Sequence, residues 1–255
     1  MLERCDMTLK LTERQYERRM GEEQLRLHLM QRRLFRTRKA SCIVFLEGWD
    51  AAGKGGAIKR IAASIDPRGY QVVAFAAPHG DEKTHHYLWR FWKHVPARGR
   101  MAIFDRSHYG RVLVERVEGF CSQEEWRRAY REINEWEGQL LSSRCAVIKF
   151  WLHITPDEQL RRFRSRERDP YRQFKLTEED WRNRARSKEY TEAVEHMLQK
   201  TSTPLAPWTV VEANDKYWAR VKIVKTIADR LEEALGNADA PGEGKKKGKK
   251  SKGRK

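Results

Sequence analysis

The fold of this chain is decided by residues 42–56, CIVFLEGWDAAGKGG. The apolar, β-branched run at 42–46 predicts a buried strand, and the sequence after the glycines is compatible with a helix. Between them, Gly48, Gly53 and Lys54 follow the spacing Gly-x-x-x-x-Gly-Lys. Strand, glycine-bounded loop and helix in this order are typical of a phosphate-binding P-loop, in which backbone N–H groups, the helix N-terminus and the lysine face phosphate oxygens.

The loop departs from the usual pattern at two positions. Gly55 stands where a Ser or Thr would supply a hydroxyl to Mg²⁺, and Asp50 places an acid inside the loop. We interpret the segment as a phosphate loop whose metal is held differently; a glycine-rich turn without a ligand is the alternative. The expected phosphate-binding residues are Gly48, Ala51, Ala52, Gly53, Gly55, Gly56, Lys59 and Arg60.

Composition limits the class of protein. The chain has 255 residues, enough for one sizeable core, and a net charge of +17. Residues 241–255 contribute +7, which leaves +10 on the body, so we expect a polyanionic partner: nucleic acid, an anionic membrane or a phosphate chain. No apolar run reaches the roughly 20 residues of a membrane span. Without a secretory signal or a dense cysteine pattern, a cytoplasmic, reduced protein is expected.

Outside the loop, strand-like and helix-like patterns alternate. Residues 7–38 predict one or two helices packed on the body, and five buried strands alternating with helices predict an α/β, doubly wound fold with a parallel five-stranded sheet. The remaining strands are expected at 70–77, 101–104, 146–152 and 207–212, and helices at 82–94, 122–141, 155–166 and 217–235. The domains are therefore a helical segment at 1–38, a core domain at 39–235 and a disordered Lys-rich tail at 236–255.

Charged residues beyond the loop indicate where chemistry would take place. The strand at 101–104 ends in Asp105, where an acid can meet a metal beside the P-loop. Arg106 and Arg111 follow, and two arginines so close to an acid predict a clamp on a transferring phosphoryl group. An ion pair that only orders the loop is the alternative for one of the two.

A second basic region precedes the last strand. Residues 161–188 are dense in Lys and Arg, and a new helix begins near 177–180. A basic helical insertion at this place predicts a lid over about 162–200 that closes on phosphates; a solvated basic hairpin is the alternative. After the last strand, residues 214–216 are expected to cradle a nucleotide base.

Several stretches together resemble the type 2 polyphosphate kinase family, P-loop kinases similar to thymidylate kinase in fold. The resemblance extends over about residues 7–235, and the glycine after Lys54 is part of the family pattern. The stretches are GWDAAGKGG at 48–56, LWRFW at 88–92, FDRS at 104–107, YGR at 109–111, ERVEG at 115–119, KFWLHI at 149–154, DWRNR at 180–184 and APW at 206–208.

The resemblance implies Mg²⁺-dependent phosphoryl transfer between inorganic polyphosphate and a nucleotide. It makes Asp50 and Asp105 the metal ligands, and Lys54, Arg106 and Arg111 the residues that neutralise the transferred group. It makes Arg166 and Lys175 lid cations that gather phosphates. Trp49 and residues 55–58 look most like the group that converts AMP to ADP, with ADP to ATP and guanine nucleotides as further substrates, and a homo-oligomer, dimer or tetramer, is expected.

Two other function classes remain as alternatives at this point. An ATP-dependent nucleoside monophosphate kinase would share the loop and lid but normally carries Ser or Thr at the position of Gly55. A non-enzymatic polyanion- or nucleic-acid-binding protein would explain the charge, but no recognition helix or aromatic RNA-binding motif is present, so specific nucleic-acid binding is not expected.

Overall fold

The computed structural model describes residues 2–236. Apart from Gly236, the predicted Lys-rich tail lies outside the described residues. Among residues 2–236, no helix is both long and apolar enough to cross a membrane.

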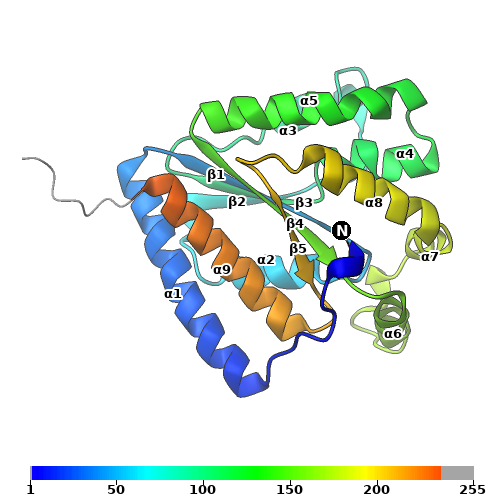
Figure 1. Cartoon of the computed structure of the whole chain (residues 1–255), viewed down its shortest axis with the longest axis horizontal. Coiled ribbons are helices and arrows are strands. Elements are labelled where there is room, and N and C mark those ends of the chain that lie inside the picture. Colours follow the sequence, from blue (N-terminus) through cyan, green and yellow to red (C-terminus); the bar gives the residue numbers. More distant parts are fainter. Residues whose placement is uncertain (1, 237–255) are drawn as a thin grey trace, which may run out of the picture.

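The described chain is built on one parallel sheet, which confirms the predicted fold class (Figure 1). The strand order is β2-β3-β1-β4-β5, so the strand that leads into the phosphate loop lies at the centre. The parallel register pairs Leu46 of β1 with Asp105 of β3, which brings the loop and the predicted metal acid to the same edge of the sheet. The strands are β1 (Ser41–Gly48), β2 (Tyr70–Ala74), β3 (Met101–Asp105), β4 (Cys145–His153) and β5 (Trp208–Glu212).

Helices cover both faces of the sheet and make two cores (Figure 1). Side chains of β1 alternate between them, with Val44 and Leu46 in the first core and Ile43 and Phe45 in the second. The first core contains α1 (Glu13–Thr37), α2 (Lys54–Ala62) and α9 (Lys216–Leu235). The second contains α3 (Trp89–Trp92), α4 (Val114–Glu118), α5 (Gln123–Ser142) and α8 (Ser187–Thr201).

The predicted lid region consists of three helices with different surroundings. α6 (Pro156–Glu167) and α7 (Glu178–Ala185) lie near the carboxyl edge of the sheet (Figure 1). α8 instead buries Tyr190, Val194 and Met197 in the second core, so the end of the predicted 162–200 range is core structure. Short 3-10 helices complete the chain: η1 (Leu2–Arg4), η2 (Pro67–Gly69), η3 (Gly80–Lys83), η4 (His108–Val112) and η5 (Gln173–Lys175).

Two predictions between 70 and 94 are wrong. The second strand was expected to be buried over 70–77, but β2 ends at Ala74 and is an edge strand whose Val72 is 44% exposed. The helix expected over 82–94 is reduced to η3 and the four-residue α3. The buried Arg90 explains this, since its guanidinium donates to Ala76 O (3.0 Å) and lies 3.3 Å from Glu82, which folds the segment back as a loop.

A buried polar cluster anchors the loop after β3. Lys149 of β4 is fully buried, and its Nζ donates to Glu137 Oε2 at 2.7 Å and Thr201 O at 2.6 Å. Tyr109 donates its hydroxyl to the same Glu137 carboxylate. The loop after Asp105 is therefore held in place by contacts of Tyr109 with the second core.

Candidate functional site

The phosphate loop has the backbone geometry that its glycines predict. Gly48 has φ = 151°, and a Cβ there would lie 2.6 Å from Leu152 O, so β1 and β4 leave room only for glycine. The chain then turns through Ala51 (φ 62°) and Gly53 (φ 113°) into α2. Lys54 Nζ returns over the loop and donates to Gly48 O at 2.8 Å. A positive helix end and a lysine thus meet at one place, as an anion site requires.

A buried arginine that the sequence analysis assigned to the lid region braces this loop. Arg162 Nη1 donates to Ala51 O and Ala52 O, both at 2.9 Å. Its Nη2 donates to Ala213 O and its Nε to Glu158 at 2.5 Å, and its side chain is only 5% exposed. Burial lowers the pKa of the guanidinium. Arg162 therefore holds the loop in shape, and it reaches the loop from α6, 110 residues away along the chain.

The predicted acids and arginines meet on the open side of the loop, with one exception. Asp50, Asp105, Lys54 and Arg106 all line one groove, and Arg106 Nη2 lies 3.7 Å from Asp50 Oδ1. Arg106 itself has φ = 63°, an uncommon conformation for a residue with a side chain. Arg106 follows Asp105, the predicted metal ligand, on the turn that leaves β3.

Arg111 is the exception, since it lines neither of the two cavities described below. Its Nε lies 3.1 Å from Glu115, its Nη1 lies 3.7 Å from Glu125, and its guanidinium stacks over Tyr87. Arg111 is thus held by ion pairs with two glutamates, and its catalytic role stays a prediction.

The groove is wide and strongly cationic. Its volume is about 720 Å³, and eleven Lys and Arg side chains and three Asp line it. The predicted phosphate contacts Lys59, Arg60, Arg166 and Lys175 are among them, with Lys216 and Arg220 from α9. Burial, and after it the nearby charges of Arg162 and Arg220, lowers the pKa of Lys216.

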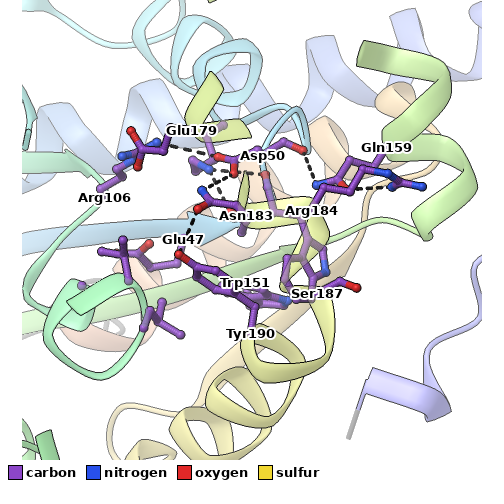
Figure 2. A pocket seen from close by; sticks show the side chains of 16 residues that line it. Glu47, Asp50, Arg106, Trp151, Gln159, Glu179, Asn183, Arg184, Ser187 and Tyr190 are labelled. Atoms are coloured by element: carbon purple, nitrogen blue, oxygen red, sulfur yellow. Dashed lines mark hydrogen bonds and ion pairs between the residues drawn. The ribbon is translucent and has the colours of Figure 1, made fainter. Parts of the chain in front are cut away.

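A smaller pocket, shown in Figure 2, shares Asp50, Lys54 and Arg106 with the groove. Its volume is about 100 Å³, and its charges are balanced by three acids and three cations. Its remaining wall is mostly apolar. The pocket is lined by Glu47, Gly48, Trp49, Asp50, Lys54, Arg106, Gly110, Leu113, Val114, Trp151, Gln159, Glu179, Asn183, Arg184, Ser187 and Tyr190.

Of the pocket residues that the sequence did not predict, two contact charged or polar groups at the site. Glu47, on β1 next to the loop, is 6% exposed and accepts a hydrogen bond from Ser107 Oγ at 2.7 Å; burial raises its pKa. Asn183 of α7 donates from Nδ2 to Asp50 Oδ2 at 2.9 Å (Figure 2). The position of Glu47 directly before Gly48 was a usable signal, whereas nothing local connects Asn183 with Asp50.

The residues expected to cradle a base have other partners. Asp215 Oδ1 accepts from Trp218 N at 2.7 Å as the N-cap of α9, and Asn214 Oδ1 accepts from Thr155 N at 3.0 Å. Lys216 lines the cationic groove. The two acidic and amide side chains at 214–215 thus stabilise the fold.

The site fits Mg²⁺ in a particular way. Asp50 and Asp105 supply hard carboxylate oxygens to the same groove. Within residues 2–236, no group of three or more His, Cys, Asp or Glu side chains forms a complete metal cage. Mg²⁺ commonly binds through one or two carboxylates and completes its shell with water and substrate phosphates, which is the arrangement that these residues allow.

Comparison with known proteins places the chain in a family. Residues 10–238 match the family model "Polyphosphate kinase 2". A polyphosphate:AMP phosphotransferase from Pseudomonas syringae pv. tomato is 51% identical over 237 residues, which are 92% of this chain and 47% of that protein. An ADP-polyphosphate phosphotransferase from Pseudomonas aeruginosa is 41% identical over 229 residues, 90% of this chain and 75% of that protein.

A solved structure supports the same assignment. The crystal structure of polyphosphate kinase 2 from Arthrobacter aurescens TC1 has a TM-score of 0.88 and 34% sequence identity, and the match covers 94% of this chain and 88% of that one. The chain spans about half the length of the polyphosphate:AMP phosphotransferases that it matches, 47% in two of them. On the family match and these identities, the chain belongs to the polyphosphate kinase 2 family.

Proposed function

We propose that this chain catalyses Mg²⁺-dependent phosphoryl transfer from inorganic polyphosphate to a nucleotide, with AMP to ADP as the main reaction and ADP to ATP as a second one. The observation that carries the proposal is the meeting of two unlike cavities at Asp50, Lys54 and Arg106. A donor and an acceptor that approach one phosphorus atom from opposite sides need such an arrangement.

The groove suits the donor. Polyphosphate carries about one negative charge per phosphate, and a cavity lined by eleven cations and only three acids attracts such a chain, although Arg162 is already paired with Glu158. An ordinary nucleoside triphosphate would leave many of these cations without a phosphate partner.

The pocket suits the acceptor. Trp49, Leu113, Val114, Trp151 and Tyr190 provide apolar surface, and the charged side chains balance one another. A nucleoside with a single phosphate matches this surface better than a long anion does. The names of the relatives point the same way, since the one at 51% identity is named for AMP and the one at 41% for ADP.

The acceptor requires the pocket to widen. Its volume of about 100 Å³ is below the roughly 300–1,000 Å³ of pockets that enclose ligands. Glu179, Asn183 and Arg184 make α7 one wall. We therefore assign the lid role to the end of α6 and to α7, with α8 as their fixed support.

The proposed mechanism depends on position and charge. An oxygen of the acceptor phosphate attacks the terminal phosphorus of the chain, and the bond from that phosphorus to the next bridging oxygen breaks, so that polyphosphate leaves one unit shorter. Lys54 and Arg106 stabilise the negative charge on the transferred group, and the P-loop orients it at the N-terminus of α2. Mg²⁺ held by Asp50 and Asp105 would neutralise phosphate oxygens when bound.

The test uses the purified full chain with long-chain polyphosphate, Mg²⁺ and, separately, AMP, ADP, GMP or GDP, with products quantified. We expect ADP from AMP at the highest rate, no comparable product when ATP replaces polyphosphate, and no product with the Lys54→Ala variant. Absence of product from every acceptor would refute the proposal. The predicted homo-oligomer is tested on the same sample by light scattering.

A further inference from the structure

Asp50 is held by a side chain that comes from a distant part of the sequence. Asn183 donates from Nδ2 to Asp50 Oδ2 at 2.9 Å across a separation of 133 residues (Figure 2). Tyr190 places its hydroxyl 3.1 Å from Asn183 Oδ1, with Glu118 Oε1 further away at 3.4 Å. Because the phenol proton needs an acceptor, the contact turns the amide oxygen toward Tyr190 and the NH₂ group toward Asp50.

α7, the helix that carries Asn183, is also attached to the body of the protein at a second place. Arg182 Nε and Arg186 Nη1 lie 3.1 Å and 3.5 Å from the Glu118 carboxylate on α4, which is 8% exposed. These two ion pairs tie α7 to the body of the protein. The hydrogen bond of Asn183 is different, because it ties α7 to a residue of the reacting centre.

Loss of that bond would change the surroundings of Asp50. Two side chains contact the carboxylate directly in the described residues: Asn183 at 2.9 Å on Oδ2 and Arg106 at 3.7 Å on Oδ1. Without the amide, the hydrogen bond that holds Oδ2 is lost, and attraction by the guanidinium favours a shift of the carboxylate toward Arg106. A carboxylate paired with Arg106 offers fewer free oxygen positions to a cation.

We propose that Asn183 is a positioning residue that couples the place of α7 to the orientation of Asp50. With α7 docked, Asn183 holds one carboxylate oxygen and leaves the other directed to the groove; with α7 displaced, Asp50 loses this support. The coupling works in both directions, so a change at Asp50 also loosens α7. The kinetic consequence rests on the proposed function, whereas the structural coupling does not.

The first test needs no substrate. Hydrogen exchange of the full chain is measured at residues 178–185 in wild type, Asp50→Ala and Asn183→Ala. We expect both variants to raise the exchange of α7 about tenfold, the effect of losing a hydrogen bond to a charged group. Asn134→Ala is the matched control, since Asn134 Nδ2 donates to Lys200 O (2.9 Å) on another helix pair. Unchanged α7 exchange in Asp50→Ala and Asn183→Ala overturns the proposal.

The second test follows the metal requirement. The Mg²⁺ concentration for half-maximal rate should rise about tenfold in Asn183→Ala, with the KM for polyphosphate unchanged. Tyr190→Phe keeps the ring and should give a smaller shift in the same direction. Tyr130→Phe is its control, because the Tyr130 hydroxyl accepts from Arg116 (3.2 Å) outside both cavities.

The outcomes separate this inference from the proposed function. An active wild type whose Mg²⁺ requirement is the same in Asn183→Ala contradicts the coupling. A wild type with no polyphosphate activity refutes the proposed function, and the exchange measurement then decides the coupling alone.

Discussion

The groove and the pocket share three side chains and are otherwise opposite in character. The groove is built from α2, α6 and α9, is about seven times larger in volume, and has eight more cations than acids. The pocket is built from the strand ends with α4, α7 and α8, has balanced charge and is lined by aromatic and aliphatic side chains. Under the proposed function, long-range charge would therefore govern binding of the donor in the groove, and shape and desolvation would govern binding of the acceptor in the pocket.

The largest effect is expected at Asp105, the proposed metal ligand that lines the groove. Asp105→Asn should lower kcat by at least about 10²–10³-fold, because the neutral amide cannot support the cation that neutralises the phosphates. The KM values for both substrates should change much less, and the thermal melting curve should stay as in wild type. A variant with near-normal rates would show that the metal assignment is wrong.

The next effect should be confined to the groove. Lys175→Ala and Arg220→Ala should each raise the KM for long-chain polyphosphate about tenfold at low salt and leave the KM for AMP unchanged. Added salt should reduce the difference from wild type. Arg131→Ala is the control, since its side chain on α5 is 77% exposed and far from the groove lining. An equal rise in the KM values for polyphosphate and AMP would contradict the assignment of the groove to the donor and the pocket to the acceptor.

A pH effect should be confined to the pocket. Burial raises the pKa of Glu47, which lies near Lys54, Arg106 and Asp105. Below that pKa the carboxyl is neutral, and above it the carboxylate repels an acceptor phosphate. The KM for AMP should therefore rise with pH in wild type by about threefold to fivefold relative to Glu47→Gln.

Polyphosphate provides the control for this effect. Because AMP itself titrates identically in both assays, the ratio of the KM for AMP in wild type to that in Glu47→Gln reports the ionisation of Glu47 alone. The corresponding ratio of the KM values for polyphosphate should be the same at every pH. If the ratio for AMP is also independent of pH, Glu47 does not contribute to binding of the acceptor.

The smallest effect is expected at Arg111. The structure pairs this side chain with Glu115 and Glu125 outside both cavities. Arg111→Met should change kcat by less than about threefold, with the main change in melting temperature. A loss of kcat comparable to that of Arg106→Met would restore the catalytic role that the motif implies.

Local signals explain why most of the fold was predictable. α5 and α7 each begin with a capping box. The hydroxyl of Ser122 or Thr177 accepts from the backbone N–H of the third helical residue, and the backbone N–H of the same Ser or Thr donates to the carboxylate of that third residue. Both helices therefore begin where these sequence patterns predict. β1 is entirely buried except for its final glycine. The uninterrupted apolar run at 42–46 predicts this burial without knowledge of the rest of the fold.

Predictions failed where the burial of a residue depends on elements that are distant in the sequence. The sequence of β2 reads as buried, yet its edge position leaves it half covered, and strand order is not a local property. α6 illustrates the same limit within the site. Arg162 and Arg166 are one turn apart in one basic run and both line the groove, but Arg162 is buried and braces the phosphate loop, whereas Arg166 is only partly buried. The burial of Gln159, Arg162 and Phe163 shows which side of α6 is internal.

Gly55 leaves room for a side chain at the start of α2. A Cβ at this position would meet no atom within 4 Å, and the residue lies in the first turn of α2 with ordinary backbone angles. A serine side chain at position 55 therefore meets no steric barrier, although the loop carries none. Gly55→Ser would add a hydroxyl at the start of α2, and the Mg²⁺ requirement of this variant would show whether a hydroxyl ligand changes how the ion is held.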